Sequence, residues 1–375
     1  MATDLAGFTV AVTADRRGDE QLVMLRRLGV DVVHAPAVRT VPIAGDERLR
    51  AATEALVATP PDVLVATTSL GVRGWLGLAS SWGLDAPLLS ALGRARVVAR
   101  GPKAAGAVAT AGLEVAWRAE SGRLRELTDH LLAGGVDGAR IAVQLDGGGS
   151  GGEAARLRAA GADVVELPVY RATLPERIEP VAQLVERCTA GTVDAITFTA
   201  APAVTNLFEV ADRRDRRDAL RRALDTMVVA CIGPVCADAA RAAGVSAPLV
   251  PPAWRLGSLV RQVGDELDGR RQTFRAGGVG LVVQGAVVVV DGTPTRLTDR
   301  ERAVFTALVR RQGAVAPRGA LLREVWGGGD ARALETVIGR LRAKLGPAGS
   351  ALETIVRRGY RWAAEPSRGG AAAVT

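Results

Sequence analysis

The chain repeats itself at a constant spacing, and this repeat limits what its first two thirds can fold into. The stretch GVDVVHAPAVRT, Gly29 to Thr40, returns 132 residues later as GADVVELPVYRA, Gly161 to Ala172. One such match would mean little, but several matches at one offset indicate two copies of one structural unit. Further pairs at the same offset are Asp62 with Asp194, Thr67 with Thr199, Gly101 with Gly233 and Gly112 with Gly244.

Each copy alternates short β-branched runs with segments of helical periodicity. In the first copy FTVAVTA precedes DEQLVMLRRLG, a helical pattern that ends on a glycine. Strands that alternate with helices predict an α/β fold with parallel sheets, here a two-lobed duplicated body. Ligands of open parallel sheets lie beyond the carboxyl ends of the strands, so we expect a cleft between the lobes. The turns expected to reach this cleft lie near Thr13, Thr67, Gly101, Gly147, Thr199 and Gly233.

The positive charge of the chain is concentrated toward its carboxyl end. The net charge is +8; residues 279–375 carry 15 Lys and Arg against 8 Asp and Glu, whereas the preceding 278 residues carry 33 against 32. A nearly neutral body followed by a basic segment is the charge pattern expected of a nucleic-acid-binding module. A solvated basic surface without a partner has the same composition, so charge alone leaves both interpretations open.

The pattern of the basic segment predicts a small domain of strands and helices. VGLVVQGAVVVVDGTPTRLT reads as short antiparallel strands. Thr298 and Glu301 form a capping-box pattern before a helix, and Asp330 is expected to cap a later one. In that later helix we expect an apolar face against the core and a basic face toward solvent. The predicted core-facing residues are Leu334, Val337, Ile338, Leu341 and Leu345.

Several features exclude other classes of protein. No run of about 18 uncharged apolar residues predicts a membrane span, and the first residues lack the pattern of a secretory signal. The spacing of the three cysteines, Cys188, Cys231 and Cys236, is not that of metal ligands, and the chain has only two histidines, so we expect no metal site. Free thiols fit a reducing compartment, so we expect the protein to be cytoplasmic. The glycine-rich stretch DGGGSGG is not followed by Gly-Lys-Ser/Thr, so we interpret it as a turn and expect no cofactor.

The duplicated body resembles uroporphyrinogen-III synthase, the enzyme that closes a linear tetrapyrrole with inversion of its last ring. The resemblance covers about Phe8 to Val263 and rests on VVELPVYRAT, TFTAAPAVTNLF and ACIGPVCADAARAAG. It implies that the chain begins in one lobe, crosses into the other near Pro36–Arg39 and returns near Pro168–Arg171. Within a body of residues 1–264, lobe one would comprise residues 1–37 and 172–264, and lobe two residues 38–171.

The same resemblance implies candidate site residues in the cleft. Tyr170 occupies the position of the tyrosine most implicated in catalysis, where a phenol can donate to a departing hydroxyl; packing is the alternative role. Hydroxyls of the family turns are replaced at Ala104, Ala200 and Val235, although backbone N–H groups can still bind an anion there. The candidate ligand-binding residues are Thr13, Arg16, Thr67, Ser69, Lys103, Tyr170, Thr199 and Cys236.

The carboxyl-terminal segment resembles the winged helix-turn-helix effector domain of the OmpR/PhoB response regulators. The matching stretches are LTDRERAVFTAL, LLREVWG, ALETVIGRLRAKLG and TIVRRGYRW, with Val356 where the wing usually has arginine and Gly339 in place of a polar residue. The predicted bounds are a linker over 265–278, the domain over 279–363 and a disordered tail over 364–375. The candidate DNA-binding residues are Arg332, Thr336, Arg340, Arg342, Lys344, Arg357 and Arg358.

The combination is similar to the actinobacterial regulators of nitrate and nitrite assimilation. It predicts a cytoplasmic transcription factor that binds double-stranded DNA and uses a degenerate synthase body as a sensor or dimerisation platform. The expected partners are promoter DNA, a tetrapyrrole or other small anionic effector, and a second copy or a co-regulator, with no membrane. The alternative is a catalytically active or bifunctional uroporphyrinogen-III synthase with a regulatory DNA-binding tail.

Overall fold

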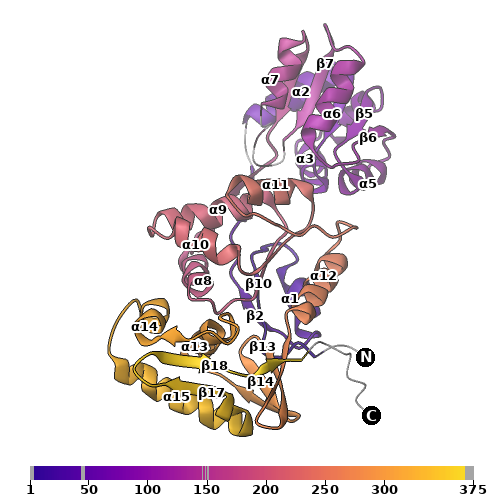
Figure 1. The fold of residues 1–375 in the computed structure, drawn as a ribbon. Coiled ribbons are helices and arrows are strands. Elements are labelled where there is room, and N and C mark those ends of the chain that lie inside the picture. The colour runs from indigo at the N-terminus through magenta and orange to yellow at the C-terminus, as the bar shows by residue number, and fades with distance from the viewer. Residues whose placement is uncertain (1–3, 44–46, 146, 148, 150–151, 368–375) are drawn as a thin grey trace.

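A computed structural model describes residues 4–43, 47–145, 147, 149 and 152–367. Lobe one lies between lobe two and a carboxyl-terminal domain (Figure 1). Both lobes contain a parallel sheet covered by helices on its two faces, which confirms the predicted α/β fold.

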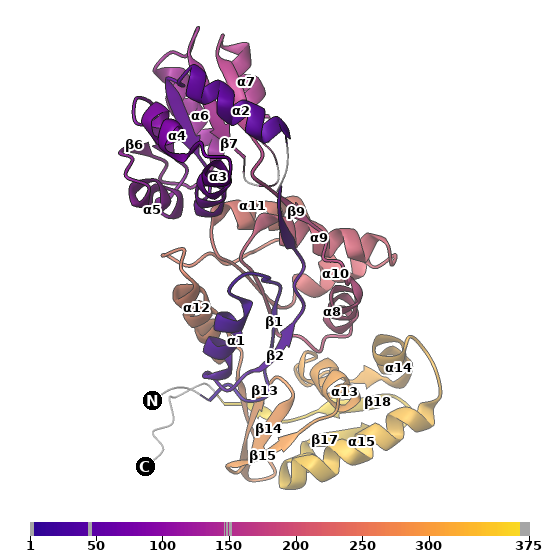
Figure 2. The ribbon, with the colours of Figure 1, turned by 180° about the vertical axis from the view of Figure 1, so that it is seen from behind.

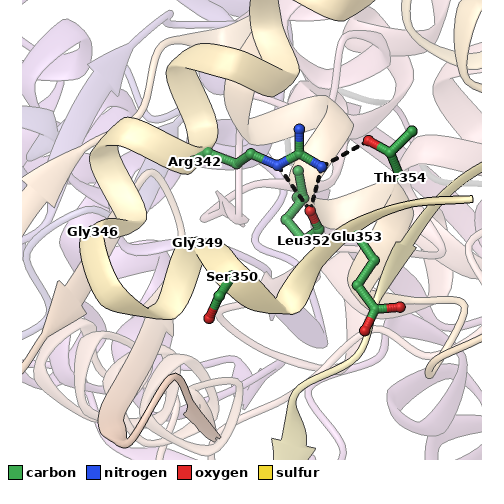
Figure 3. A pocket seen from close by; sticks show the side chains of 7 residues that line it. All are labelled: Arg342, Gly346, Gly349, Ser350, Leu352, Glu353 and Thr354. Carbon is green, nitrogen blue, oxygen red and sulfur yellow. Dashed lines mark hydrogen bonds between the residues drawn. The ribbon is translucent and has the colours of Figure 1, made fainter.

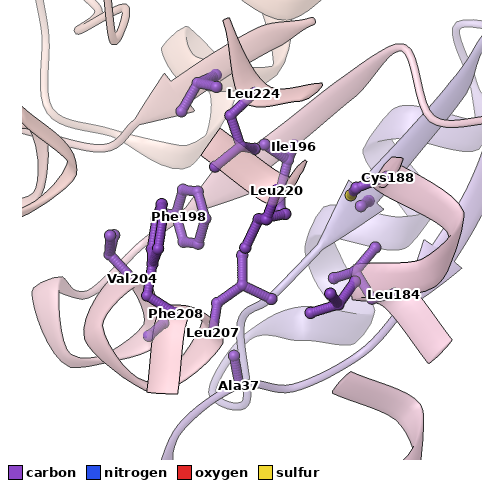
Figure 4. Packing of buried hydrophobic residues seen from close by; sticks show 14 of the residues in the cluster. Ala37, Leu184, Cys188, Ile196, Phe198, Val204, Leu207, Phe208, Leu220 and Leu224 are labelled. Carbon is purple, nitrogen blue, oxygen red and sulfur yellow. The ribbon is translucent and has the colours of Figure 1, made fainter. Parts of the chain in front are cut away.

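Lobe one is built on a four-stranded parallel sheet in the order β11-β10-β1-β2. One face packs on α1 and α12, and the other packs on α8 to α11 around Phe198 and Leu207 (Figure 4). β10 is entirely buried because helices cover it on both sides. The elements are β1 (Thr9–Val12), α1 (Gly18–Arg26), β2 (Asp31–His34), α8 (Glu179–Thr189), β10 (Ala195–Phe198), α9 (Ala201–Asp212), α10 (Arg217–Leu224), β11 (Val228–Cys231), α11 (Pro234–Ala242) and α12 (Leu256–Gly269).

Lobe two repeats this plan with five parallel strands in the order β6-β5-β4-β7-β8. Helices α2 to α5 cover one face around Trp75, and α6 and α7 cover the other face around Leu127. The elements are α2 (Glu47–Ala58), β4 (Val63–Ala66), α3 (Ser69–Ser81), α4 (Asp85–Leu92), β5 (Arg96–Ala99), α5 (Pro102–Thr110), β6 (Val115–Arg118), α6 (Leu124–Ala133), β7 (Arg140–Gln144), α7 (Glu153–Ala159) and β8 (Asp163–Leu167).

Two antiparallel strands connect the lobes, β3 (Arg39–Pro42) and β9 (Tyr170–Thr173) (Figure 2). The paired strands begin three and two residues after the starts of the stretches named from the sequence, Pro36–Arg39 and Pro168–Arg171. Asn206 of α9 fixes its lobe-one end, since its side-chain amide donates to the carbonyls of Ala37 and Thr173 at 2.8 and 3.1 Å. The lobes are therefore joined by a narrow ribbon.

The residues interpreted as a linker, 265–278, are ordered elements. α12 continues to Gly269 because Val263 and Leu267 extend its buried stripe, and β12 (Gln272–Ala276) begins three residues later. β12 pairs with β13 (Val279–Gln284) across Gly277 and Gly278, both with positive φ, which is the geometry of a tight glycine hairpin. The carboxyl-terminal domain therefore begins at β12.

The carboxyl-terminal domain has two antiparallel sheets around three helices and a 3₁₀ turn. The larger sheet has the order β15-β14-β13-β12-β19 and the smaller one β16-β18-β17. The core gathers around Phe305 and Trp362, whose rings meet edge to face at 5.0 Å. The remaining elements are β14 (Val287–Val290), β15 (Thr293–Arg296), α13 (Asp299–Val309), β16 (Ala316–Pro317), α14 (Arg318–Trp326), α15 (Ala331–Leu345), η1 (Gly346–Ala351), β17 (Leu352–Ile355), β18 (Gly359–Trp362) and β19 (Glu365–Pro366).

Local predictions for this domain are confirmed. Thr298 and Glu301 form the reciprocal capping box, and Asp330 accepts a hydrogen bond from the Arg332 amide. The five apolar residues named for α15 are its buried residues. The proposed tail differs in part, since Glu365 and Pro366 pair with β12; residues 368–375 lie outside the described part of the chain.

Candidate ligand cleft and nucleic-acid interface

The two lobes contact each other through an ion pair. Arg123, just before α6 of lobe two, donates from Nε and Nη2 to the two carboxylate oxygens of Asp238 in α11 of lobe one, at 2.6 and 3.1 Å. This guanidinium holds the pKa of Asp238 below its usual value. Trp254 of lobe one packs against Gly122, the residue before Arg123: a Cβ on Gly122 would lie 2.9 Å from its ring. Lobe two thus rests on lobe one here.

A positive charge of lobe one affects a lysine of lobe two. Lys103, in the first turn of α5, has a lowered pKa because it is partly removed from solvent and because Arg17 of lobe one is nearby. Arg17 precedes α1 in a left-handed conformation, and Glu20 accepts from its Nε at 2.6 Å. A site where two cations of opposite lobes repel each other favours an anion that neutralises them.

Tyr170 faces the turn that opens α3 of lobe two. Its hydroxyl donates to the Thr68 hydroxyl at 3.3 Å, and its ring packs on Gly147, where a Cβ would lie 2.5 Å from Cε2. Ser69 and Thr199 are half-buried at the corresponding turns, and Arg16 is exposed before α1. These residues are placed at the carboxyl ends of the strands, where the sequence predicted the cleft.

Three other candidates are turned into the protein interior. The Thr13 hydroxyl donates to the Thr197 carbonyl and the Thr67 hydroxyl to the Gln144 carbonyl, both at 2.7 Å. The Cys236 thiol lies 3.6 Å from the Phe198 carbonyl oxygen within the lobe-one core. These side chains are nearly inaccessible to solvent; the two threonines hold strands together and Cys236 ties α11 to β10, so this geometry favours a structural role for them.

Gln144 is a site residue that the sequence reasoning missed. Its side-chain oxygen accepts from the backbone N–H groups of Thr67 and Thr68 at 3.2 and 3.0 Å. Backbone N–H groups at such a turn are what an anionic ligand would otherwise use. The available signal was a polar residue at the carboxyl end of an apolar strand, RIAVQ. Among the described residues no cluster of His, Cys, Asp or Glu has the arrangement of a metal site.

The exposed face of α15 is basic and lined by small residues. Arg332, Thr336, Gly339 and Arg340 are all exposed, and the Thr336 hydroxyl donates back to the Arg332 carbonyl at 2.9 Å. The helix lies on the side of the domain away from lobe one (Figures 1 and 2). This face has the size and charge of one that can enter a DNA major groove.

Two other basic side chains of α15 are engaged within the domain. Arg342 donates from Nε and Nη2 to the Leu352 carbonyl at 2.9 and 2.6 Å, and from Nη2 to the Thr354 hydroxyl at 2.8 Å (Figure 3). Lys344 donates to the buried Glu301 carboxylate at 2.6 Å. Burial raises the pKa of Glu301, but bonds from Lys344 and Thr298 outweigh this and lower it overall. Both cations therefore tie α15 to its neighbours.

The wing is a tight turn between β17 and β18. Its turn closes where the Arg358 amide donates to the Ile355 carbonyl at 2.9 Å, and Arg357 adopts a left-handed conformation with φ of 58°. Val356 is 78% exposed at its tip. An arginine in this conformation costs about 1 kcal/mol relative to glycine, so the turn keeps two adjacent cations at some expense in stability.

Comparisons with known proteins match both parts of the chain. A family model described as uroporphyrinogen-III synthase HemD matches residues 20–261, and one described as transcriptional regulatory protein, C terminal, matches residues 292–362. The Bacillus subtilis protein YjjA, described as uncharacterised, is 27% identical over 261 residues, 69% of this chain and 96% of that one.

Two further similarities concern one part each. A mutant uroporphyrinogen III synthase of Thermus thermophilus has a TM-score of 0.60 and 32% identity, covering 70% of this chain and 100% of that one. The sensory transduction protein RegX3 of Mycolicibacterium smegmatis is 33% identical over 96 residues, which are 24% of this chain and 42% of RegX3. The chain thus spans less than half of RegX3. Together these matches confirm both resemblances seen in the sequence.

No helix in the ranges that the structure describes is long and apolar enough to cross a membrane.

Proposed function

This chain belongs to the uroporphyrinogen-III synthase family across residues 20–261, joined to a transcriptional regulatory domain, and we propose that it regulates transcription by binding DNA while the synthase-like body binds an anionic effector. The observation that carries the proposal is the basic exposed face of α15 with the two wing arginines beside it. A domain of this type suggests a DNA-binding regulator in its own right.

We propose that only some of the DNA-binding residues named from the sequence contact DNA directly. Arg332, Thr336 and Arg340 would reach base edges or phosphates from α15, and Arg357 and Arg358 would reach the phosphates from the wing. Arg342 and Lys344 would not contact DNA; they would stabilise the domain by tying α15 to the smaller sheet and to α13.

The effector of the proposal is a tetrapyrrole or another small polyanion in the cleft. Its carboxylates would neutralise the repulsion between Arg17 and Lys103 and approach Arg16. Ser69, Thr199 and Tyr170 would supply hydroxyls at the neighbouring turns. An effector that binds both lobes changes their relative position when it has different affinity for the two arrangements.

A regulatory rather than catalytic body is supported by changes at the turns. Gln144 already satisfies the N–H groups of Thr67 and Thr68, and Ala104 and Ala200 lack the hydroxyls expected of a synthase. The second candidate function is an active synthase with a regulatory tail. The observation that favours it is Tyr170, whose hydroxyl lies at the cleft within 3.3 Å of Thr68.

The proposed regulon is nitrate and nitrite assimilation, in the cytoplasm, with a second copy or a co-regulator as partner. The chemical link is that sirohaem, the cofactor of nitrite reductase, derives from uroporphyrinogen III. A body that binds a tetrapyrrole would let the cell adjust the expression of nitrite reductase genes to the supply of the cofactor.

A synthase assay separates the two candidate functions. We expect the full-length protein to form little uroporphyrinogen III from hydroxymethylbilane, because hydroxyl donors are missing from its turns. The control is the Tyr170→Phe variant, which should then differ little from the wild type. Robust cyclisation that Tyr170→Phe abolishes would establish the synthase instead.

A further inference from the structure

Lobe one and the carboxyl-terminal domain meet in an interface that includes backbone contacts. The segment before β1 runs along the turn between β13 and β14, where the Ala286 amide donates to the Gly7 carbonyl at 2.7 Å. The Gln284 side chain donates to the Ala6 carbonyl at the same distance. A Cβ on Gly285 would lie 2.2 Å from the Gly7 carbonyl oxygen, so only glycine fits this approach.

A nearly buried ion pair lies at the same interface. Arg302 of α13 donates from Nη2 to an Asp194 oxygen at 2.6 Å, and the two side chains are 11% and 12% exposed. The other Asp194 oxygen accepts from the Thr9 amide at 2.8 Å. One carboxylate thus joins the starts of β10 and β1 to α13. Removing one partner by mutation would leave a nearly buried charge unpaired at the interface, which is strongly unfavourable.

The internal repeat offers a comparison for this aspartate. Asp62 is its counterpart in lobe two and accepts from the Arg140 amide at 2.7 Å, just as Asp194 accepts from Thr9. Asp62 is exposed, whereas Asp194 also binds Arg302. Holding two strand starts together is therefore the shared role of both aspartates, and the bond to Arg302 is an addition specific to lobe one.

The covalent connection between the two domains is short and tied down. Two residues, Arg270 and Arg271, separate α12 from β12. Arg270 donates to the Thr226 carbonyl at 2.8 Å, and Arg271 donates to the Asp4 carbonyl. At the outer edge Arg296 of β15 forms an ion pair with Asp31 of β2. The contacts between the two domains are thus not limited to the Asp194–Arg302 pair.

We propose that lobe one and the carboxyl-terminal domain form a single rigid body, in which the interface between Asp194, Arg302, Gly7 and Gly285 fixes the orientation of α15. β1 and β10 begin at this interface and end at the cleft, so the lobe-one wall of the cleft and α15 keep a constant relative orientation. The domain is then rigidly attached to lobe one and is not connected to it by a flexible linker. Lobe two is then joined to this body by the ribbon of β3 and β9 and by the Arg123–Asp238 pair.

Hydrogen exchange of the full-length protein tests this inference, because the Ala286 amide is bonded across the interface. In the wild type we expect peptides covering residues 284–287 and 5–9 to exchange as slowly as the central strands of the larger sheet. Arg302→Ala should speed exchange in both peptides on the order of tenfold or more, because it leaves Asp194 unpaired. Arg310→Ala, an exposed change at the end of the same helix, should leave both unchanged.

The paired aspartates give a second measurement that does not depend on Arg302→Ala remaining folded. Asp62→Asn and Asp194→Asn each weaken a strand-start hydrogen bond, but only Asp194→Asn removes the charge that faces Arg302. We expect Asp194→Asn to speed exchange at residues 284–287 and Asp62→Asn to leave it as in the wild type. Rapid exchange of the Ala286 amide in the folded wild type, or equal effects of the two asparagine variants there, would overturn the proposal.

Discussion

Arg340 and Arg342 of α15 have the same chemistry and different surroundings. Arg340 is exposed, whereas Arg342 reaches back to the carbonyl of Leu352 on the first strand of the wing hairpin. The sequence predicted the buried residues of this helix because they follow from its period alone. It could not show which arginine is exposed and which is bonded within the domain, because the partner of Arg342 is a backbone carbonyl ten residues away.

The contrast between these arginines gives a prediction. Arg340→Ala should weaken binding to the operator by about 1–3 kcal/mol while binding to random DNA changes less, because a bidentate contact to guanine is lost. Arg342→Ala should lower the free energy of unfolding by about 1–2 kcal/mol and leave the operator-to-random ratio unchanged, because its bonds are internal. Fluorescence anisotropy and denaturant unfolding measure both. An unchanged ratio for folded Arg340→Ala would refute the assignment.

Lys103 is predicted to be unfavourable for stability and favourable for ligand binding. Its pKa is below the ordinary lysine value, so the unfolded chain binds a proton more readily and this lysine opposes folding at neutral pH. The opposition fades as pH rises through its folded pKa toward the ordinary value. Lys103→Met should therefore raise the melting temperature of the ligand-free protein at pH 7 and weaken binding of uroporphyrinogen III. A lower melting temperature would contradict the proposed repulsion.

At the scale of elements, the strand β12 shows what the sequence reasoning missed and why. QTFRA has only one large apolar residue, so its composition resembled a linker, yet the Gly277-Gly278 pair after it is a recognised hairpin signal. The capping box and the repeat were predictable because each depends on residues at fixed spacing. The docking of lobe one on α13 was not, because Asp194 and Arg302 are 108 residues apart.

In the wing turn, Arg357 lowers stability through its left-handed backbone conformation but supplies a positive charge for DNA. Arg357→Gly should raise the free energy of unfolding by up to about 1 kcal/mol, because glycine adopts the left-handed conformation without a Cβ clash. It should also weaken binding to all DNA sequences equally and lower the slope of log affinity against log salt by about one, because one phosphate contact is lost. Arg358→Gly is the matched control for stability: it should lower the slope similarly but should not raise the free energy of unfolding, because Arg358 is not in the left-handed conformation. A wing that does not touch DNA would leave the slope unchanged.

In the whole molecule, the proposed effector site and the regulatory domain lie at opposite ends of lobe one. The carboxyl ends of β1 and β10 face the cleft and lobe two, and their amino ends face the carboxyl-terminal domain. The duplication and the two family resemblances predicted both bodies from the sequence. Which cleft residues remain accessible could not be predicted, because Thr13 and Ser69 look alike in the sequence and differ only in how they pack.

We propose that this protein binds DNA through the exposed face of α15 and the wing. The direct measurement is the affinity of the full-length protein for duplex DNA from upstream of its candidate target genes, compared with a random duplex over a range of salt concentrations. With about four phosphate contacts, the slope of log affinity against log salt should be near −3.6, and the upstream duplex should bind more tightly at every salt concentration. The absence of binding, or an affinity that does not change with salt, would contradict the claim.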